Sequence, residues 1–220
     1  MKLLKTRFTW LSLAAILCLL MAAPASADTL YDNGPINGTV DAWTINFGYQ
    51  VSNSFTLGAG STLTGAQIGL WLSPGDSPTS VNWSIGTTPY DSSLGSGTGV
   101  LTDTFQSTNP YGYSLDESTF SLGGTLAAGT YYLTLQNLAI PSGGPGYWDQ
   151  NSGPSSAYES AVGSLGAVCG NGYPGPVGGT CSESFQIYGN SGTATPEPAS
   201  LVLLGSGMLI FAGFMRKFAS

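Results

Sequence analysis

The chain has 220 residues, with 12 Asp or Glu, 5 Lys or Arg and no His. All the basic residues lie in the first seven positions or at positions 216 and 217, so residues 28–195 hold eleven acidic side chains and no cation. This charge excludes nucleic acid and anionic lipid headgroups as partners of that region. The absence of His excludes Ser-His-Asp triads and zinc sites built on His, so only paired carboxylates remain for acid-base chemistry and we expect no enzyme.

The first 27 residues have the three parts of a secretory signal peptide. A basic segment ends at Arg7, an apolar run follows from Phe8 to about Ala23, and Ala25-Ser26-Ala27 provides the small residues that signal peptidase recognises. The alternative is a permanent N-terminal anchor helix, which the small residues argue against. We therefore expect cleavage after Ala27, with signal peptidase as a partner during export.

Residues 28–188 show the alternation of apolar and polar side chains that is typical of β-strands. The longest alternating row, from Trp43 to Leu57, predicts one half-buried strand or two strands joined by a bend. Further strands are expected at 66–72, 81–85, 99–106, 120–122, 129–136 and 185–187, and one helical turn near 158–164. Short strands separated by turns predict an all-β fold, a single β-sandwich domain of the jelly-roll type.

Two cysteines remain once the signal peptide is removed, Cys169 and Cys181. They bracket a segment rich in Gly and Pro, which has few side chains to pack. In an oxidising compartment they are expected to form a disulfide that restricts this loop. The alternative, a metal site, would require more ligands than two thiols.

Two groups of residues are candidate binding sites. Trp71, Tyr147 and Trp148 are candidate platforms for sugars, although packing of large aromatic side chains under loops is the commoner role. Asp149 and Asn151 place oxygen ligands at alternate positions, as the start of a calcium loop would, but the further acidic ligands of such a loop are missing. A surface turn is the simpler interpretation. We expect no cofactor, with calcium as the only candidate.

Residues 189–195 form a small, polar linker that precedes a distinctive C-terminal tail. The tail begins with Pro196-Glu197-Pro198, continues with an apolar run at 199–215 and ends with Arg216-Lys217. This combination resembles a PEP-CTERM sorting tail. The run is long enough for a short transmembrane helix, and the basic pair would remain on the cytoplasmic side. The alternatives are a buried core helix and a permanent tail anchor.

The resemblance implies that an exosortase recognises residues 196–217 and that the host is a Gram-negative, exopolysaccharide-producing bacterium. The protein would first be anchored in the inner membrane by its C-terminal helix and then reach the cell surface or the extracellular matrix. We therefore expect a non-enzymatic exported protein of that location, associated with exopolysaccharide. The alternatives are a glycan- or calcium-binding adhesion module and a carboxylate-based glycan hydrolase.

Overall fold

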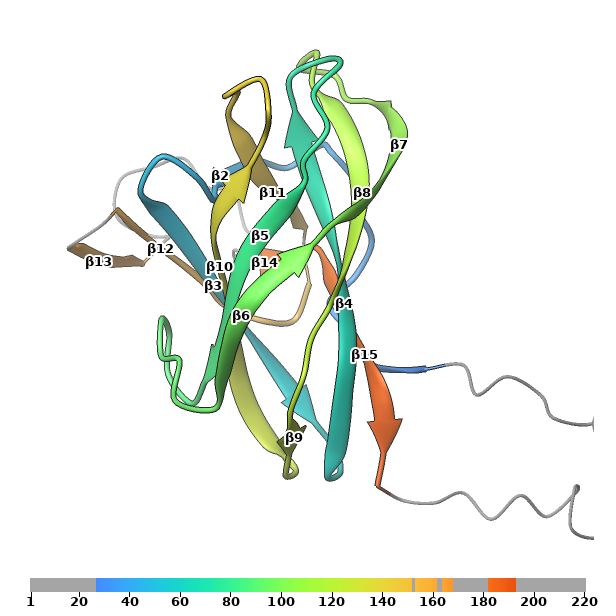
Figure 1. Cartoon of the computed structure of the whole chain (residues 1–220), viewed down its shortest axis with the longest axis vertical. Coiled ribbons are helices and arrows are strands. Elements are labelled where there is room, and N and C mark those ends of the chain that lie inside the picture. The colour runs from blue at the N-terminus through green and yellow to red at the C-terminus, as the bar shows by residue number, and fades with distance from the viewer. Residues whose placement is uncertain (1–26, 152, 162–163, 168–181, 193–220) are drawn as a thin grey trace, which may run out of the picture.

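The structure, a computed structural model, describes residues 27–151, 153–161, 164–167 and 182–192. These residues form two antiparallel sheets, of nine and six strands, and contain no helix (Figure 1). No helix in these ranges has the length and hydropathy that crossing a bilayer requires. The expected all-β fold is confirmed at this level, whereas the signal peptide and the C-terminal helix lie outside the described residues.

The nine-stranded sheet is built around one long strand, β4, which pairs with β8 and β9 and also with β15 and β11. Outer strands then pair with these neighbours: β7 with β8, β1 with β15, and both β2 and β14 with β11. Its strands are β1 (Asp28–Asp32), β2 (Ala42–Thr44), β4 (Ser61–Leu72), β7 (Thr102–Thr108), β8 (Ser114–Ser121), β9 (Thr125–Leu126), β11 (Gly146–Asn151), β14 (Ser182–Glu183) and β15 (Phe185–Ser191).

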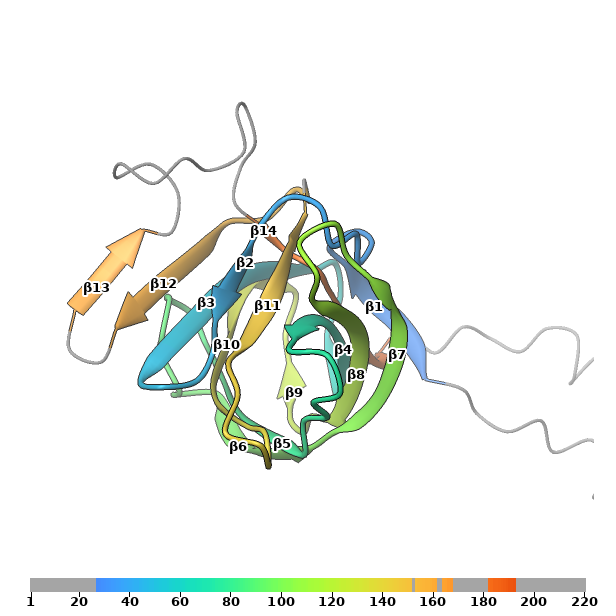
Figure 2. The same cartoon turned by 90° about the horizontal axis from the view of Figure 1, so that it is seen from above.

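The six-stranded sheet has the order β13-β12-β3-β10-β5-β6. Its strands are β3 (Tyr49–Leu57), β5 (Ser80–Gly86), β6 (Gly95–Val100), β10 (Gly129–Ala139), β12 (Ala157–Ala161) and β13 (Ser164–Ala167). Figure 2 shows the two sheets facing each other around a common interior, with β12 and β13 extending beyond it to one side. The predicted helical turn at 158–164 is wrong, because β12 pairs along β3 and then with β13.

The core lies between the two sheets and is made of the alternating apolar side chains. Val51 and Phe55 of β3 and Leu133 and Leu135 of β10 are buried against Ile68 and its neighbours on β4. Burial of this apolar area is the main favourable contribution to folding, since the described residues contain no Lys, Arg or His for an ion pair.

The long alternating row of residues 43–57 is two strands joined by a bend, as one of the two predictions had it. Phe47 and Gly48 have positive φ angles of 54° and 86°, and the amide of Tyr49 donates to the carbonyl of Asn46 at 3.0 Å. β2 therefore pairs with β11 in one sheet, and β3 pairs with β10 in the other. A similar crossing divides the predicted strand at 99–106 into β6 and β7 at the buried Leu101.

The two ends of the described chain lie side by side. Asp28 of β1 is paired with Gly189 of β15, and Ser191 is paired with Ser61 at the start of β4. Both ends leave the same part of the molecule in Figure 1. β15 continues to Ser191, so the folded domain extends three residues past 188 into the predicted linker.

Candidate functional site

Trp148 is part of the core, which agrees with the packing role given as the commoner alternative and leaves no exposed ring for a sugar. Its side chain is 0% exposed and packs edge-on against Phe185, with ring centroids 5.6 Å apart. Its indole Nε1–H donates to the carbonyl of Ser184 at 2.9 Å. Tyr147 and Trp148 are neighbours on β11, so their side chains point to opposite faces of the strand, and only Tyr147 is partly exposed.

Trp71 belongs to a group of four aromatic side chains, which we name the distal aromatic cluster. Its ring is stacked with that of Tyr111 at 5.5 Å and 24°, and lies 5.9 Å from that of Tyr113. Tyr113 in turn meets the ring of Tyr147 edge-on at 5.6 Å. Trp71 is buried, whereas the side chain of Tyr111 is 60% exposed and forms the solvent-facing side of the cluster. The two predicted residues, Trp71 and Tyr147, are thus linked by Tyr111 and Tyr113, which no sequence pattern had indicated.

Backbone and side-chain hydrogen bonds fix the position of this cluster. The Asn109 Oδ1 atom accepts hydrogen bonds from the backbone amides of both Tyr111 and Tyr113, each at 3.0 Å. The Tyr111 hydroxyl donates to the carbonyl of Thr39 at 3.3 Å, and the Trp71 Nε1–H donates to Asp149 Oδ1 at 2.6 Å. The rings are therefore held in place before any ligand arrives. Two tyrosines in the short turn between β7 and β8 were the signal available in the sequence.

Asp149, a candidate calcium ligand, is engaged in hydrogen bonds inside the domain. Its side chain is 0% exposed, and its two oxygens accept from the amides of Asn37 and Gly38, both at 3.0 Å, and from Trp71. Burial raises the pKa of Asp149, although these hydrogen bonds act in the opposite direction. The carboxyl group thus joins the loop at 37–38 to the distal aromatic cluster.

Asn151, the other candidate calcium ligand, is also buried. Its Nδ2 donates to the carbonyl of Asn33 at 2.8 Å, and its Oδ1 accepts from the amide of Gly153 at 2.8 Å. Among the described residues, no group of three or more His, Cys, Asp or Glu side chains is close enough to hold a metal ion. Calcium binding stays a prediction that the positions of these two side chains do not favour.

Two further acidic side chains, Glu183 of β14 and Glu159 of β12, interact electrostatically with each other and with Asp41. Glu183 is 0% exposed, and burial raises its pKa well above the ordinary value, with a smaller contribution from the charge of Asp149. Burial and then the charge of Asp41 raise the pKa of Glu159 to about 7. No cation in the domain compensates these charges, so burial raises the pKa of both groups without an opposing ion pair.

Asp103 and Asp116 form a carboxyl pair between β7 and β8. Burial raises the pKa of Asp116 to about 7, and a hydrogen bond with Asp103 and the charge of Asp103 add to the increase. The Ser118 hydroxyl also donates to Asp103. Two carboxyls within hydrogen-bond reach of each other are closer than the separations of about 5–10 Å that glycosidases use, which leave room for the scissile bond or a water.

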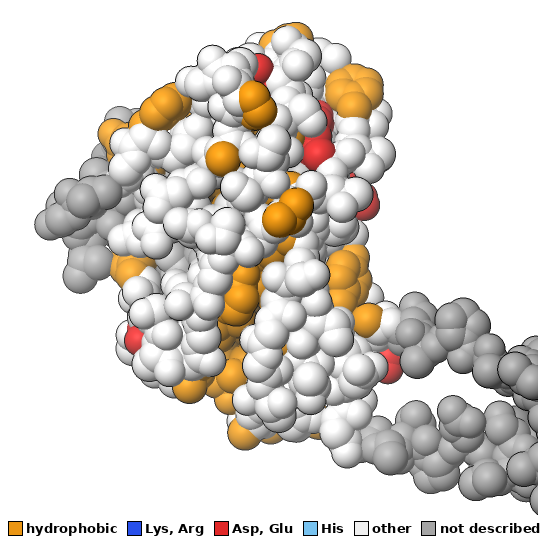
Figure 3. Space-filling view, in the orientation of Figure 1, with side chains coloured by type: hydrophobic (Ala, Val, Ile, Leu, Met, Phe, Trp, Pro, Cys, Tyr) orange, Lys and Arg blue, Asp and Glu red, His pale blue; other side chains and the backbone are white. Residues whose placement is uncertain are grey.

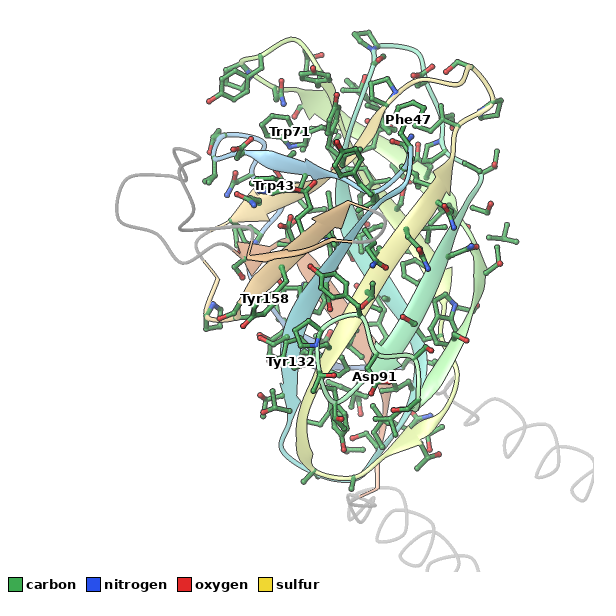
Figure 4. The ribbon with its side chains drawn as sticks, turned by 90° about the vertical axis from the view of Figure 1, so that its left-hand side faces the viewer. Trp43, Phe47, Trp71, Asp91, Tyr132 and Tyr158 are labelled. Carbon is green, nitrogen blue, oxygen red and sulfur yellow. The ribbon has the colours of Figure 1, made fainter. Side chains whose placement is uncertain are left out.

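A second aromatic group lies on the outer face of the six-stranded sheet. Tyr132 and Tyr158 meet at 6.0 Å with their rings tilted by 61°, and Figure 4 shows both on this face. Between them and the β5–β6 loop, Ser52 accepts hydrogen bonds from the Thr134 hydroxyl at 2.9 Å and from the amide of Tyr90 at 3.3 Å. Both rings are half-buried.

A groove of about 420 Å³ lies beside the bend at Phe47. Phe47 is 65% exposed, and Asn137, on the other side of the groove, also has a positive φ angle of 52°. The groove is open, and apart from Phe47 and the polar Asn46, Thr79 and Asn137, its lining is apolar or glycine, between Leu138 and Gly144. It therefore offers one exposed ring and few side-chain hydrogen-bonding groups.

The predicted sorting residues Pro196, Glu197, Pro198, Arg216 and Lys217 and the predicted disulfide Cys169–Cys181 lie outside the described residues. Comparison with known proteins identifies the tail. Residues 194–217 match the family model described as the PEP-CTERM protein-sorting motif. The chain carries a PEP-CTERM sorting motif. The motif implies that this protein is exported and sorted by an exosortase. No curated protein matches the chain in sequence.

The PEP-CTERM motif begins two residues after Gly192, which follows β15, so the position of β15 fixes the end of the domain that lies nearest the tail. Ser191 is paired with Ser61 at the first residue of β4, and Trp71 is ten residues further along the same strand. At about 3.3 Å per residue, Trp71 lies roughly 33 Å from that end. Figure 4 shows Trp71 at the end of the sandwich opposite to the departing chain ends.

Proposed function

We propose that this PEP-CTERM protein is a non-enzymatic component of the cell surface or extracellular matrix of a Gram-negative bacterium, associated with exopolysaccharide. The observation that carries the proposal is the junction of a sorting motif to an all-β domain within two residues of its last described position. Before processing, the apolar run at 199–215 would hold the protein in the inner membrane. A jelly-roll arrangement of the two sheets belongs to the same proposal.

The chemistry available in the domain supports a role without catalysis. Residues 28–195 contain no His, Lys or Arg. A catalytic base would therefore have to be a carboxyl group or a neutral residue, and only neutral groups could bind an anion. Asp103 and Asp116 are in hydrogen-bond reach of each other, and Asp149 and Glu183 are fully buried. The carboxylate-based hydrolase is accordingly the least favoured of the three functions.

Export through the sorting motif gives the first testable prediction. Replacing Glu197 with alanine, or deleting residues 199–217, is expected to stop processing, since exosortase would no longer recognise the tail or find it in the membrane. Mass spectrometry of the protein from membrane and extracellular fractions would show an uncleaved, membrane-retained form for Glu197→Ala. The deletion is expected to yield protein that leaves the membrane without exosortase cleavage.

The matched control is Glu117→Ala, which removes a half-buried glutamate of β8 and leaves the tail intact. It is expected to be processed as the unmodified protein is. An unchanged mass and location for the Glu197→Ala protein and for the deletion would contradict sorting through this motif.

The second candidate function is a glycan- or calcium-binding adhesion module in the same location. The distal aromatic cluster favours its glycan-binding form, because Tyr111 exposes an aromatic ring whose position is fixed by hydrogen bonds. The buried positions of Asp149 and Asn151 give calcium binding less support.

A further inference from the structure

We propose that the distal aromatic cluster is a binding site for an uncharged polysaccharide chain, with the exposed ring of Tyr111 as the surface on which a sugar ring stacks. The inference rests on the proposed surface or matrix role and specifies the partner and the site. Sugar rings have apolar C–H faces and hydroxyl edges, so they suit an exposed aromatic ring with hydrogen-bonding groups beside it.

The ring of Tyr111 is held in position by its neighbours before a ligand binds. Tyr111 stands on the indole of Trp71, its amide and hydroxyl are both engaged, and the indole is in turn held by buried Asp149. An exposed aromatic side chain usually loses rotational freedom when it binds a ligand. Here much of that loss occurs on folding, so a stacking contact retains more of its energy.

Charge selects the class of ligand. The domain has eleven carboxyl groups and no cation, and the face in Figure 3 shows Asp and Glu at several separate places with no Lys or Arg. An anionic polymer such as a uronic acid chain would be repelled and would find no basic side chain to bind. Next to Tyr111, the exposed residues Thr39, Pro110 and Gly112 are uncharged. An uncharged glycan meets this surface without an electrostatic penalty.

The distal aromatic cluster lies far from the end of the domain that joins the sorting motif. The cluster lies at the end of β4 remote from Ser61, where the chain leads to the sorting motif. The cluster therefore lies roughly 33 Å from the end of the domain that joins the tail. While the tail is in the membrane, this is the part of the domain best placed to meet an external polymer. The other aromatic side chains near the surface lack this combination. Tyr132 and Tyr158 are half-buried. Phe47, Tyr49 and Phe105 are exposed, but none of them packs on a second ring among the described residues.

The test uses the mature protein purified after export and measures retention in affinity gels that contain one polysaccharide each. The probes are a neutral β-glucan, a neutral galactomannan and, as the anionic comparison, alginate. We expect retention by at least one neutral polymer and none by alginate. For that neutral polymer, Tyr111→Ala is expected to lower the affinity by about tenfold or more, as loss of one aromatic stacking contact does.

Two matched variants separate stacking from general effects. Tyr111→Phe keeps the ring and is expected to bind within about twofold of the unmodified protein, because only the bond to Thr39 is lost. Tyr49→Ala removes another exposed tyrosine, 40% exposed and outside the cluster, and is expected to bind normally. Thermal unfolding of each variant shows whether it is folded, and the exposed position of Tyr111 makes a large loss of stability unexpected.

The outcomes distinguish the site from the wider function. Full binding by Tyr111→Ala, or loss of binding in Tyr158→Ala instead, would overturn this site and leave a glycan-binding function in place. Absence of retention by both neutral polymers, in a protein that is still sorted and processed, would overturn glycan binding here without affecting the exported surface or matrix role. Equal retention by alginate would overturn the argument from charge.

Discussion

Replacing Trp148 with alanine is expected to lower the free energy of unfolding by about 3–5 kcal/mol, the range for removal of a large aromatic side chain from a core. Trp148 is 0% exposed and contacts Phe185, which lies in the same core as Phe55. The substitution would leave a cavity and would also remove the donor to the carbonyl of Ser184. Both effects act in the same direction, so this single change is expected to remove much of a typical domain's stability.

Denaturant unfolding followed by far-ultraviolet circular dichroism would measure the change without depending on tryptophan fluorescence. Trp148→Phe is the conservative comparison and is expected to cost less, because it retains most of the apolar volume. Tyr49→Ala, at a 40% exposed position, is the control for removal of an aromatic side chain from the surface. A cost below about 1 kcal/mol for Trp148→Ala would contradict its place in the core.

The folded domain is expected to be more stable at pH 5 than at pH 8. Asp116 and Glu159 each have a pKa raised to about 7, first of all by burial. In the unfolded chain these carboxyls ionise near pH 4, so between about pH 4 and pH 7 the folded state binds more protons than the unfolded state. Their contribution to stability is therefore fully present below pH 4 and is lost as the pH rises through 7.

Glu159 is only half-buried, so we reduce the full linkage value and expect a loss of about 2 kcal/mol between pH 5 and pH 8. Burial raises the pKa of Glu183 and Asp149 as well, and these groups change stability in the same direction. The measurement is the free energy of unfolding of the mature protein in urea at a series of pH values.

Asp116→Asn isolates one contribution to this dependence. An amide N–H can donate to Asp103 at every pH, whereas the carboxyl group of Asp116 can do so only when it is protonated. The variant is expected to be more stable than the unmodified protein at pH 8, by about 1 kcal/mol, and close to it at pH 5. Asp28→Asn, at an exposed position of β1, is the matched control and is expected to leave the pH dependence unchanged. Equal destabilisation by Asp116→Asn at both pH values would contradict a pH-dependent hydrogen bond from Asp116 to Asp103.

Much of the fold could be predicted from local patterns. Alternation in residues 129–136 predicted β10, because adjacent side chains on a strand point to opposite faces. The predicted helical turn failed in its described part, where residues 158–161 are rich in small side chains and show no clear periodicity. Pairing of these residues with β3 determines their conformation. The alternation through residues 43–57 also could not distinguish a single strand from two strands joined by a bend at Phe47. The bend preserves the alternation while the chain passes from one sheet to the other.

Only part of the candidate site could be predicted from the sequence. Trp71 and Tyr147 were proposed as sugar-binding residues, and the structure joins them in one cluster, but its most exposed ring belongs to Tyr111, on a turn 40 positions after Trp71. No local pattern relates these positions. Their contact depends on the pairing of β4 with β8, which places Leu115 opposite Trp71. Trp148 was proposed on the same grounds as Tyr147, and the orientation of β11 separates their roles.

The sequence by itself determined the sorting motif, the all-β class and the absence of cations from residues 28–195, because these properties reside in residue type and short spacing. Tertiary structure alone decided which aromatic side chains are exposed and which carboxyl groups are buried together. Those properties depend on contacts between strands far apart in the chain. Burial without a counter-ion raises the pKa of Asp116 and Glu183. Tyr111 stacks on buried Trp71 and exposes its own ring to solvent.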